Sequence, residues 1–304
     1  MDERLSALGT EGWRKDLADL DLRSTSEMVA AMNAADAEVH RAVADAAPAI
    51  AAAIEGIAPK LRGGGRLIYV GAGTPGRLCE LDAAECPPTY NVDESTVQAL
   101  IAGAHLTGRE REAAEDDGGA GEADLRKIGL TANDSVVGVT ASGRTPYVRG
   151  AIAYARSVGA FTVGLVNNAG ATLSAEVDVA IEVQTGPEVV LGSTRLKAGT
   201  GQKMVLNMLS TLSMVSTGHT FGNLMIDLRA DNLKLRVRAA KMVALASGVS
   251  EEDAAKALEA SNFETRTAVA AITRSVGPDE ARKLLAEHGG DLRAVVGKDI
   301  PSAT

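Results

Sequence analysis

Short apolar runs and helical stretches alternate through the middle of the chain. Five runs are rich in β-branched residues, and they are Leu67–Val70, Val97–Ile101, Val136–Val139, Phe161–Val166 and Val177–Val183. The third and fourth are apolar almost throughout, as is typical of strands buried on both faces, whereas the fifth alternates and favours an edge strand. Stretches of helical character, such as Pro146–Val158, separate most of the runs. This alternation predicts an α/β fold with a doubly wound, mainly parallel five-stranded sheet.

Both ends of the chain have helical patterns instead. Ser24–Glu27 fits a capping box, and a second, alanine-rich helix is expected from about Ala35 to Leu61. A long helix from about Arg195 to Thr217 closes the sheet region, and the pattern after Gly222 predicts a small bundle of short helices. We therefore expect three regions: an N-terminal helical segment over 1–62 that packs on the sheet, a sheet domain over 63–222, and a C-terminal helical region over 223–304.

The composition disfavours several classes of function. Aromatic residues make up 3% of the 304 residues, which is too few for base-stacking platforms. The formal net charge is −9 and no run of Lys or Arg is present, so we expect no nucleic-acid partner. An anionic ligand would need a local site. The sequence has neither a signal-peptide pattern nor an apolar stretch of membrane-spanning length, which predicts a cytoplasmic protein with no membrane partner.

The cysteines and histidines do not form a metal-binding pattern. Cys79 and Cys86 lie close together, but none of the four histidines supplies further ligands in register. Buried free cysteines usually act as small hydrophobic residues. We therefore predict neither a metal site nor a cofactor.

The first apolar run ends in a G-x-G-x-x-G string at Gly71–Gly76. This string alone is weak evidence for a dinucleotide site, because such a site also needs an acid after the second strand to hold the ribose hydroxyls. Here the second strand runs into Gly103–His105, and the nearest acids, Asp93 and Glu94, precede the strand. The pattern therefore disfavours NAD.

Hydroxyl-bearing loops elsewhere favour a monophosphate. Thr140–Thr145 follows the third run where a helix begins, and Gly192–Arg195 precedes the long helix in the same way. Hydroxyls, glycine and free N–H groups at a helix N-terminus suit an anion, although Ser and Thr also serve as simple helix caps. Loops that follow parallel strands converge along the carboxyl edge of the sheet. The candidate phosphate-binding residues are Gly73, Thr74, Ser142, Gly143, Arg144, Thr145, Ser193 and Thr194.

Longer strings around these loops resemble the sugar isomerase (SIS) domain and, within it, the N-acetylmuramic acid 6-phosphate etherase family. The strings are Gly71–Arg77, Leu81–Thr89, Ala141–Val148, Gly192–Thr200 and Leu206–Thr211. The resemblance covers the chain from about Thr10 to Val296. Its most specific strings are Glu85–Pro88 and Ser142–Tyr147, which are far more specific to the family than the glycine loop.

The resemblance implies an enzyme that removes D-lactate from N-acetylmuramic acid 6-phosphate in cell-wall recycling, as a homodimer without metal or nucleotide. It implies that Glu85 is the catalytic acid and that Glu115 is a second essential glutamate. On composition alone, Glu115 would belong to a solvated acidic face. We also expect Glu188 and Lys197 to line the pocket beside Ser193. The helices after about Val249 resemble a small ubiquitin-associated-type bundle.

One departure from the family pattern leaves alternatives open. Pro75 stands where the first phosphate loop usually has a serine, and this removes both a hydroxyl and a backbone donor. A non-catalytic sugar-phosphate regulator of the glucokinase regulatory protein type and a sugar-phosphate isomerase are the alternatives. The presence of both Glu85 and Glu115 favours the enzyme.

Overall fold

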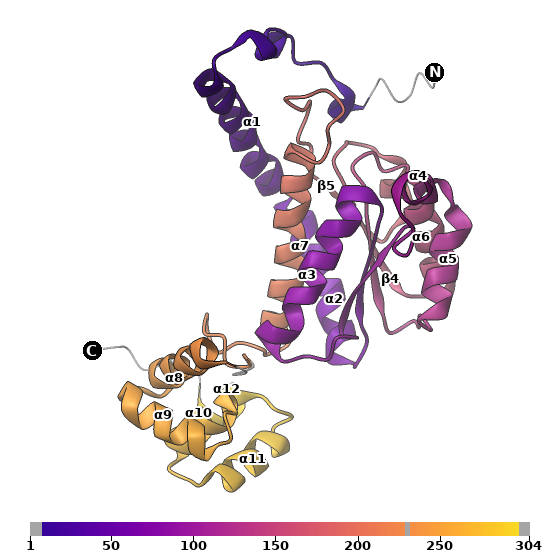
Figure 1. Ribbon diagram of the computed structural model, residues 1–304. Helices are drawn as coiled ribbons and strands as arrows, with labels where there is room; N and C mark the ends of the chain where they lie inside the picture. The colour runs from indigo at the N-terminus through magenta and orange to yellow at the C-terminus, as the bar shows by residue number, and fades with distance from the viewer. Residues whose placement is uncertain (1–7, 229–231, 298–304) are drawn as a thin grey trace. The chain divides into compact units, whose positions relative to one another are not determined.

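The computed structural model describes residues 8–228 and 232–297, and the chain divides into two compact units (Figure 1). The first unit comprises 1–84 and 94–213, and the second comprises 85–93 and 214–304. Helices α3 (Gly73–Tyr90) and α7 (Lys197–Ser216) contribute residues to both units.

The N-terminal part of the first unit is helical. Three short 3₁₀ helices (Gly9–Glu11, Lys15–Leu17 and Leu20–Leu22) lead into α1 (Thr25–Asp45) and α2 (Ala47–Arg62). The capping box is confirmed, because Ser24 Oγ accepts the Glu27 N–H and the Glu27 carboxylate accepts the Ser24 N–H.

The predicted start of the second helix near Ala35 is wrong. Helix α1 continues to Asp45, and the break falls at Ala46. Pro48 explains this position, because proline lacks an N–H and is tolerated in the first turn of a helix but not in its interior. Among the described residues, no single helix is long and apolar enough to cross a membrane, although α1 and α2 together, bent by 56°, pass the same test of length and composition.

The predicted five-stranded sheet is confirmed, and every pairing in it is parallel. The strands are β1 (Leu67–Gly71), β2 (Val97–Ile101), β3 (Ser135–Val139), β4 (Phe161–Val166) and β5 (Val179–Glu182), in the order β2-β1-β3-β4-β5. The alternating fifth run lies at an edge, as its pattern predicted. Because the chain leaves β1 for one neighbour and returns to the other as β3, the loops that follow these two strands lead away from each other.

Helices cover both faces of this sheet. The remaining helices of the first unit are α4 (Gly108–Ala113), α5 (Gly118–Lys127) and α6 (Pro146–Val158), with 3₁₀ helices at Ala114–Asp116 and Thr172–Glu176. Ile68 and Val70 of β1 pack in one core with α5 and α6. Tyr69 lies between them and donates to Asp82 of α3, so α3 covers the opposite face. Asn207 and Ser210 of α7 donate to the same carboxylate and join α7 to α3.

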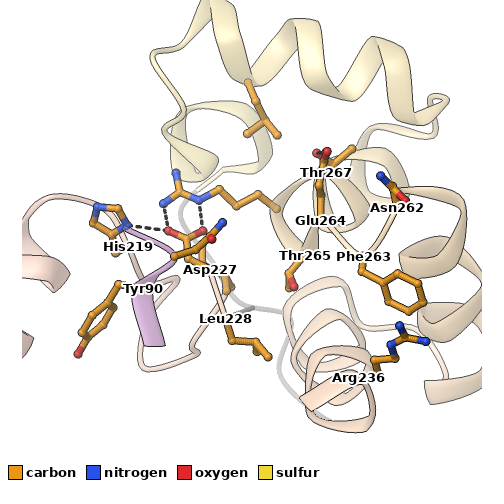
Figure 2. Close-up of a pocket in the computed structure, with 14 residues that line it drawn as sticks. Tyr90, His219, Asp227, Leu228, Arg236, Asn262, Phe263, Glu264, Thr265 and Thr267 are labelled. Atoms are coloured by element: carbon orange, nitrogen blue, oxygen red, sulfur yellow. Dashed lines mark hydrogen bonds and ion pairs between the residues drawn. The ribbon is translucent and has the colours of Figure 1, made fainter. Parts of the chain in front are cut away.

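The second unit is a bundle of short helices, as predicted. They are α8 (Leu233–Ser247), α9 (Glu251–Ala260), α10 (Thr265–Arg274), α11 (Pro278–Glu287) and α12 (Leu292–Val296), around an apolar core. Arg266 pairs with Asp227, which His219 also contacts through Nδ1 at 2.8 Å (Figure 2). These charges line a cavity of about 780 Å³.

Candidate active site

The two loops that follow β1 and β3 have glycines where the chain approaches its neighbours closely. A methyl group on Gly71 would lie 2.8 Å from the Gly76 nitrogen, and one on Gly76 would lie 2.7 Å from Ile101 Cγ2. Gly73 has a φ of +57°, which a residue with a side chain rarely adopts. The G-x-G-x-x-G string therefore serves a tight turn from β1 into α3 and places Thr74 and Pro75 in the first turn of that helix.

The second loop, Thr140–Thr145, forms a cluster of hydroxyls at the start of α6. Thr140 Oγ1 and Thr145 Oγ1 lie 2.8 Å apart, and Ser142 Oγ accepts the Arg144 N–H at 3.2 Å. Gly143 has a φ of +71°, and a methyl group there would collide with Ala171. Thr145 is the N-cap of α6 but makes no side-chain capping hydrogen bond. The free N–H groups of the first turn of this helix can therefore bind an anion.

The third cluster lies before α7. A methyl group on Gly199 would lie 3.6 Å from both Thr74 Cγ2 and the Thr194 carbonyl oxygen, so the loop containing Ser193 and Thr194 approaches the start of α3. Glu188 is buried, and its carboxylate accepts the N–H groups of Lys197 and Ala198 at 2.9 Å each. Glu188 therefore caps α7.

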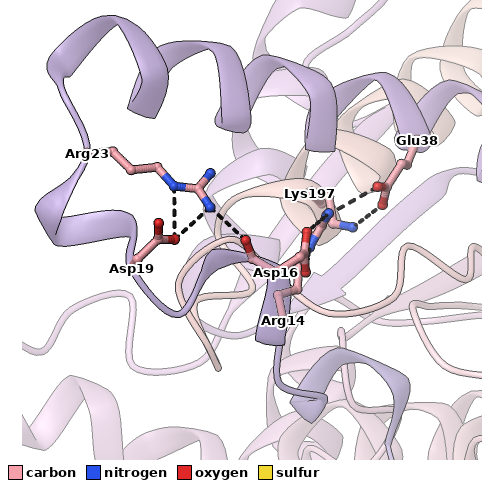
Figure 3. A network of polar contacts seen from close by, with 6 residues as sticks. All are labelled: Arg14, Asp16, Asp19, Arg23, Glu38 and Lys197. Carbon is pink, nitrogen blue, oxygen red and sulfur yellow. Dashed lines mark hydrogen bonds and ion pairs between the residues drawn. The ribbon is translucent and has the colours of Figure 1, made fainter.

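Lys197 is fully buried and is held by a network from the N-terminal segment (Figure 3). Its Nζ lies 2.7 Å from the Glu38 carboxylate, which Arg14 also contacts at 3.2 Å. Burial acts to raise the pKa of Glu38, but the hydrogen bond and charge of Lys197, with Arg14, outweigh it and lower that pKa. The charge of Lys197 is thus compensated within the chain.

Glu115 lines a cavity of about 360 Å³ together with Gly73, Arg77, Leu106, Thr107, Gly108 and Glu112. The carboxylate is accessible, but the cavity walls desolvate it in part. This burial, followed by the negative charges of Asp116 and Glu112, raises the pKa of Glu115 above its ordinary value. The cavity thus brings Gly73 of the first loop together with Glu115.

The fold places Glu115 through the helices on either side of it. Asp117 caps α5 by accepting the Ala120 N–H at 3.0 Å, so this member of the acidic string has a structural role. Helices α5 and α6 pack so closely at Gly121 that a methyl group there would lie 2.1 Å from the Tyr147 carbonyl oxygen. Tyr147 also donates to Asp124 at 2.7 Å. The 3₁₀ turn that carries Glu115 is therefore fixed against the helix that follows the hydroxyl loop.

Glu85 lies near the C-terminal end of α3, in the second unit, and its side chain is exposed. Its neighbour Cys86 is buried, as is Cys79, and neither of these two cysteines forms a disulfide bond. Burial raises the pKa of the Cys79 thiol above its ordinary value, which makes it a poor nucleophile. Within the ranges 8–228 and 232–297, no group of three His, Cys, Asp or Glu side chains could hold a metal ion.

Five residues that line the Glu115 cavity were absent from the sequence-based site: Arg77, Leu106, Thr107, Gly108 and Glu112. The register gives a signal for Thr107, because Gly71 pairs with Ile101 and the β1 and β2 loops therefore start at the same edge. Arg77 and Glu112 lie on helical stretches and look like solvated charges in the sequence.

Relatives with similarity over nearly the whole chain identify its family. An N-acetylmuramic acid 6-phosphate etherase of Rubrobacter xylanophilus is 52% identical, covering 98% of this chain and 99% of its own. The proteins of that name from Streptomyces coelicolor and Escherichia coli O6:H1 are 51% and 48% identical, covering 96% and 97% of this chain and 94% and 100% of their own. The chain belongs to the N-acetylmuramic acid 6-phosphate etherase family.

Two broader similarities accompany this etherase family membership. A family model for the N-terminal SIS domain of glucokinase regulatory protein matches residues 49–156. Among solved structures, a phosphoheptose isomerase of Francisella tularensis has a TM-score of 0.48 and 14% identity, covering 64% of this chain and 100% of its own.

Proposed function

We propose that this protein cleaves the D-lactyl ether of N-acetylmuramic acid 6-phosphate and releases D-lactate and N-acetylglucosamine 6-phosphate, as a step in cell-wall sugar recycling. The observation that carries the proposal is the identity of about one half with etherases of that name over nearly the full chain. The cavity at the carboxyl edge of the sheet, where open α/β sheets bind their ligands, supports it.

The proposed chemistry needs a base and an acid. When the sugar ring is open, the aldehyde acidifies the hydrogen on C2, and Glu115 takes this proton. Glu85 donates a proton to the ether oxygen as the C3–O bond breaks, so that a C2–C3 double bond forms and D-lactate leaves. The ionised Glu85 then takes a proton from a water molecule as the hydroxyl of that water adds to C3. Glu115 returns the proton that it accepted to C2. Both carboxyl groups end in their starting states.

The raised pKa of Glu115 suits the role of base. A carboxylate with a higher pKa accepts a proton from carbon more readily than an ordinary surface glutamate. Glu115 is the better supported of the two catalytic residues on these grounds.

We propose that the phosphate binds at the start of α6, to the loop of Ser142, Gly143, Arg144 and Thr145, with Gly73 and Thr74 on the β1 side. The uncapped N–H groups of α6 support this position. Ser193 and Thr194 would close the site from the third loop. Glu188 and Lys197 would shape its wall, because they fix the start of α7.

We further propose that the enzyme is a cytoplasmic homodimer. Glu85 is exposed in the single chain, whereas an acid that donates a proton near neutral pH needs a raised pKa. A second copy that covers Glu85 would provide the missing burial. Hybrid dimers that combine Glu85→Ala and Glu115→Gln chains test this arrangement. Activity in the hybrid would show that the two glutamates of one site come from different copies.

A D-lactate assay tests the function directly. We expect D-lactate from the parent protein incubated with N-acetylmuramic acid 6-phosphate, and none above background from Glu85→Ala. Glu80→Ala is the matched control, because Glu80 is an exposed glutamate of the same helix. Binding of the sugar phosphate without turnover in the parent would favour a regulator, and formation of a ketose phosphate would favour an isomerase.

A further inference from the structure

Arg77 is the one basic side chain among the described residues that line the Glu115 cavity. It lies in the second turn of α3, after Gly73. Within the described part of the chain its guanidinium makes no hydrogen bond or ion pair, and neither Glu112 nor Glu115 lies within 4.0 Å of its nitrogens. The cavity therefore keeps a positive charge and two acids apart, with space between them for a ligand.

Lys197, a basic residue that the sequence predicted for this site, is in a different situation. Its ammonium group is fully buried and paired with Glu38 at 2.7 Å. A lysine in that state has little charge left to offer to a ligand. Since the chain as a whole carries a net charge of −9, an anionic substrate depends on local cations such as Arg77.

The substrate of the proposed function has two anionic groups. One is the phosphate, which it shares with its product N-acetylglucosamine 6-phosphate. The other is the carboxylate of the D-lactyl group, which leaves with the D-lactate. A guanidinium group presents two parallel N–H donors that match the two oxygens of a carboxylate.

We propose that Arg77 binds the carboxylate of the D-lactyl group and so selects sugar phosphates that carry this group from those that do not. The inference rests on the proposed function. Arg77 shares the cavity with Glu115, the proposed base at C2, and the lactyl ether is on the adjacent carbon, C3. The phosphate would lie at the other end of the sugar, at the loop that starts α6.

Binding measurements with two ligands test this assignment. The experiment uses the Glu85→Ala variant, which should not turn over the substrate and leaves the cavity residues unchanged. In this variant, the Kd values of N-acetylmuramic acid 6-phosphate and N-acetylglucosamine 6-phosphate are measured by calorimetry. Adding Arg77→Met should weaken binding of the muramic acid phosphate by roughly 10- to 100-fold, as expected for a lost charge-assisted hydrogen-bond pair, and that of the glucosamine phosphate by less than about 2-fold. Arg77→Lys should restore part of the loss. Arg41→Met, at an exposed arginine of α1, is the matched control and should change neither value.

Equal weakening of both ligands would assign Arg77 to the shared phosphate and overturn the proposal. No change in either Kd, or no preference for the muramic acid phosphate when Arg77 is present, would also overturn it. The proposed function fails in a different way, namely if the parent protein releases no D-lactate. The two failures are therefore separable, because the Kd comparison does not depend on turnover.

Discussion

The amino and carboxyl ends of the strands in the parallel sheet each have an arginine and an acid nearby. The two charges are paired at the amino ends and unpaired at the carboxyl ends. Where the strands begin, Arg66 and Asp134 stand just before β1 and β3 and pair through two contacts, at 2.8 and 3.0 Å. Asp134 also accepts the N–H groups of Arg66 and Thr131, and Arg66 donates to two carbonyl oxygens. Where the strands end, Arg77 and Glu115 share a cavity without pairing.

The pKa values of the two acids differ accordingly. Burial acts to raise the pKa of Asp134, but the hydrogen bonds from Arg66 and from the backbone outweigh it and hold the pKa below its ordinary value. At Glu115, burial and the neighbouring acids act in the same direction, and the pKa rises. The carboxylate of Asp134, whose ionised form is stabilised by its partners, contributes to the stability of the fold. The carboxylate of Glu115, whose ionised form is disfavoured by its surroundings, is available for proton transfer.

Removal of the acid at the carboxyl edge should have the largest effect on activity. We expect Glu115→Gln to lower kcat/KM for D-lactate release by roughly 100- to 10,000-fold, the range for loss of a general base. Since the folded-state pKa of Glu115 is raised, its ionised form does not favour folding at neutral pH, and the free energy of unfolding should stay unchanged or rise slightly. Steady-state kinetics and urea unfolding measure the two quantities.

Glu112→Gln is the control for this experiment, because Glu112 lines the same cavity and acts on Glu115 only as the last of the three causes of its raised pKa. It should keep most of the activity. If Glu115→Gln lost stability as well as activity, Glu115 would belong with the paired charges, and the contrast between the two edges would fail.

Removal of the acid at the opposite edge should act on stability instead. Asp134 has a side-chain exposure of 2%, and Asp134→Ala leaves the guanidinium of Arg66 without its anionic partner, with only two carbonyl oxygens as acceptors. We expect the free energy of unfolding to fall by about 3–5 kcal/mol, while kcat/KM per folded molecule stays near the parent value. Asp16→Ala, which removes an exposed partner of Arg14, should leave the free energy of unfolding nearly unchanged.

The pH dependence of this loss provides a second measurement. Because the folded-state pKa of Asp134 is lowered, its contribution is present above the ordinary aspartate pKa of about 3.9 and disappears as the pH falls through the folded-state value. The difference in unfolding free energy between the parent and Asp134→Ala should therefore shrink below about pH 4. A difference that stayed constant to pH 2 would contradict the assignment to the ionised pair.

Much of this fold could be predicted from local pattern, but the contrast between its edges could not. Runs such as Val136–Val139 are apolar on both faces and predict buried strands whatever their partners are. By contrast, Arg66 and Asp134 are far apart in the sequence and meet only because β1 and β3 pair in register. The break at Ala46 was misplaced because the surrounding sequence is rich in alanine, and Pro48 is its one local signal.

The same limit applies to the candidate site. Hydroxyls before a helix, as in Thr140–Thr145, are visible in a sequence, because helix N-termini have a local pattern. Whether Arg77 lines a cavity depends on a loop that follows a different strand. Glu188 was expected beside the ligand, and the structure gives its carboxylate to the first N–H groups of α7. The roles of Glu85, Glu115 and the phosphate-binding residues stay predictions.

The smallest expected effect concerns the electrostatic tuning of Glu115. Asp116 is the second cause of its raised pKa after burial, so Asp116→Asn should lower that pKa. The acid limb of kcat/KM reports the essential base of the free enzyme, and we expect its midpoint to shift to lower pH by less than about one unit. The midpoint should stay above that of an ordinary glutamate, because burial, the larger cause, is retained.

Asp117→Asn is the control, since asparagine also caps α5 and Asp117 is not among the causes of the shift. An unmoved or raised midpoint in Asp116→Asn would mean that the acid limb belongs to another group, and the base at the carboxyl edge would then have to be sought elsewhere than at Glu115.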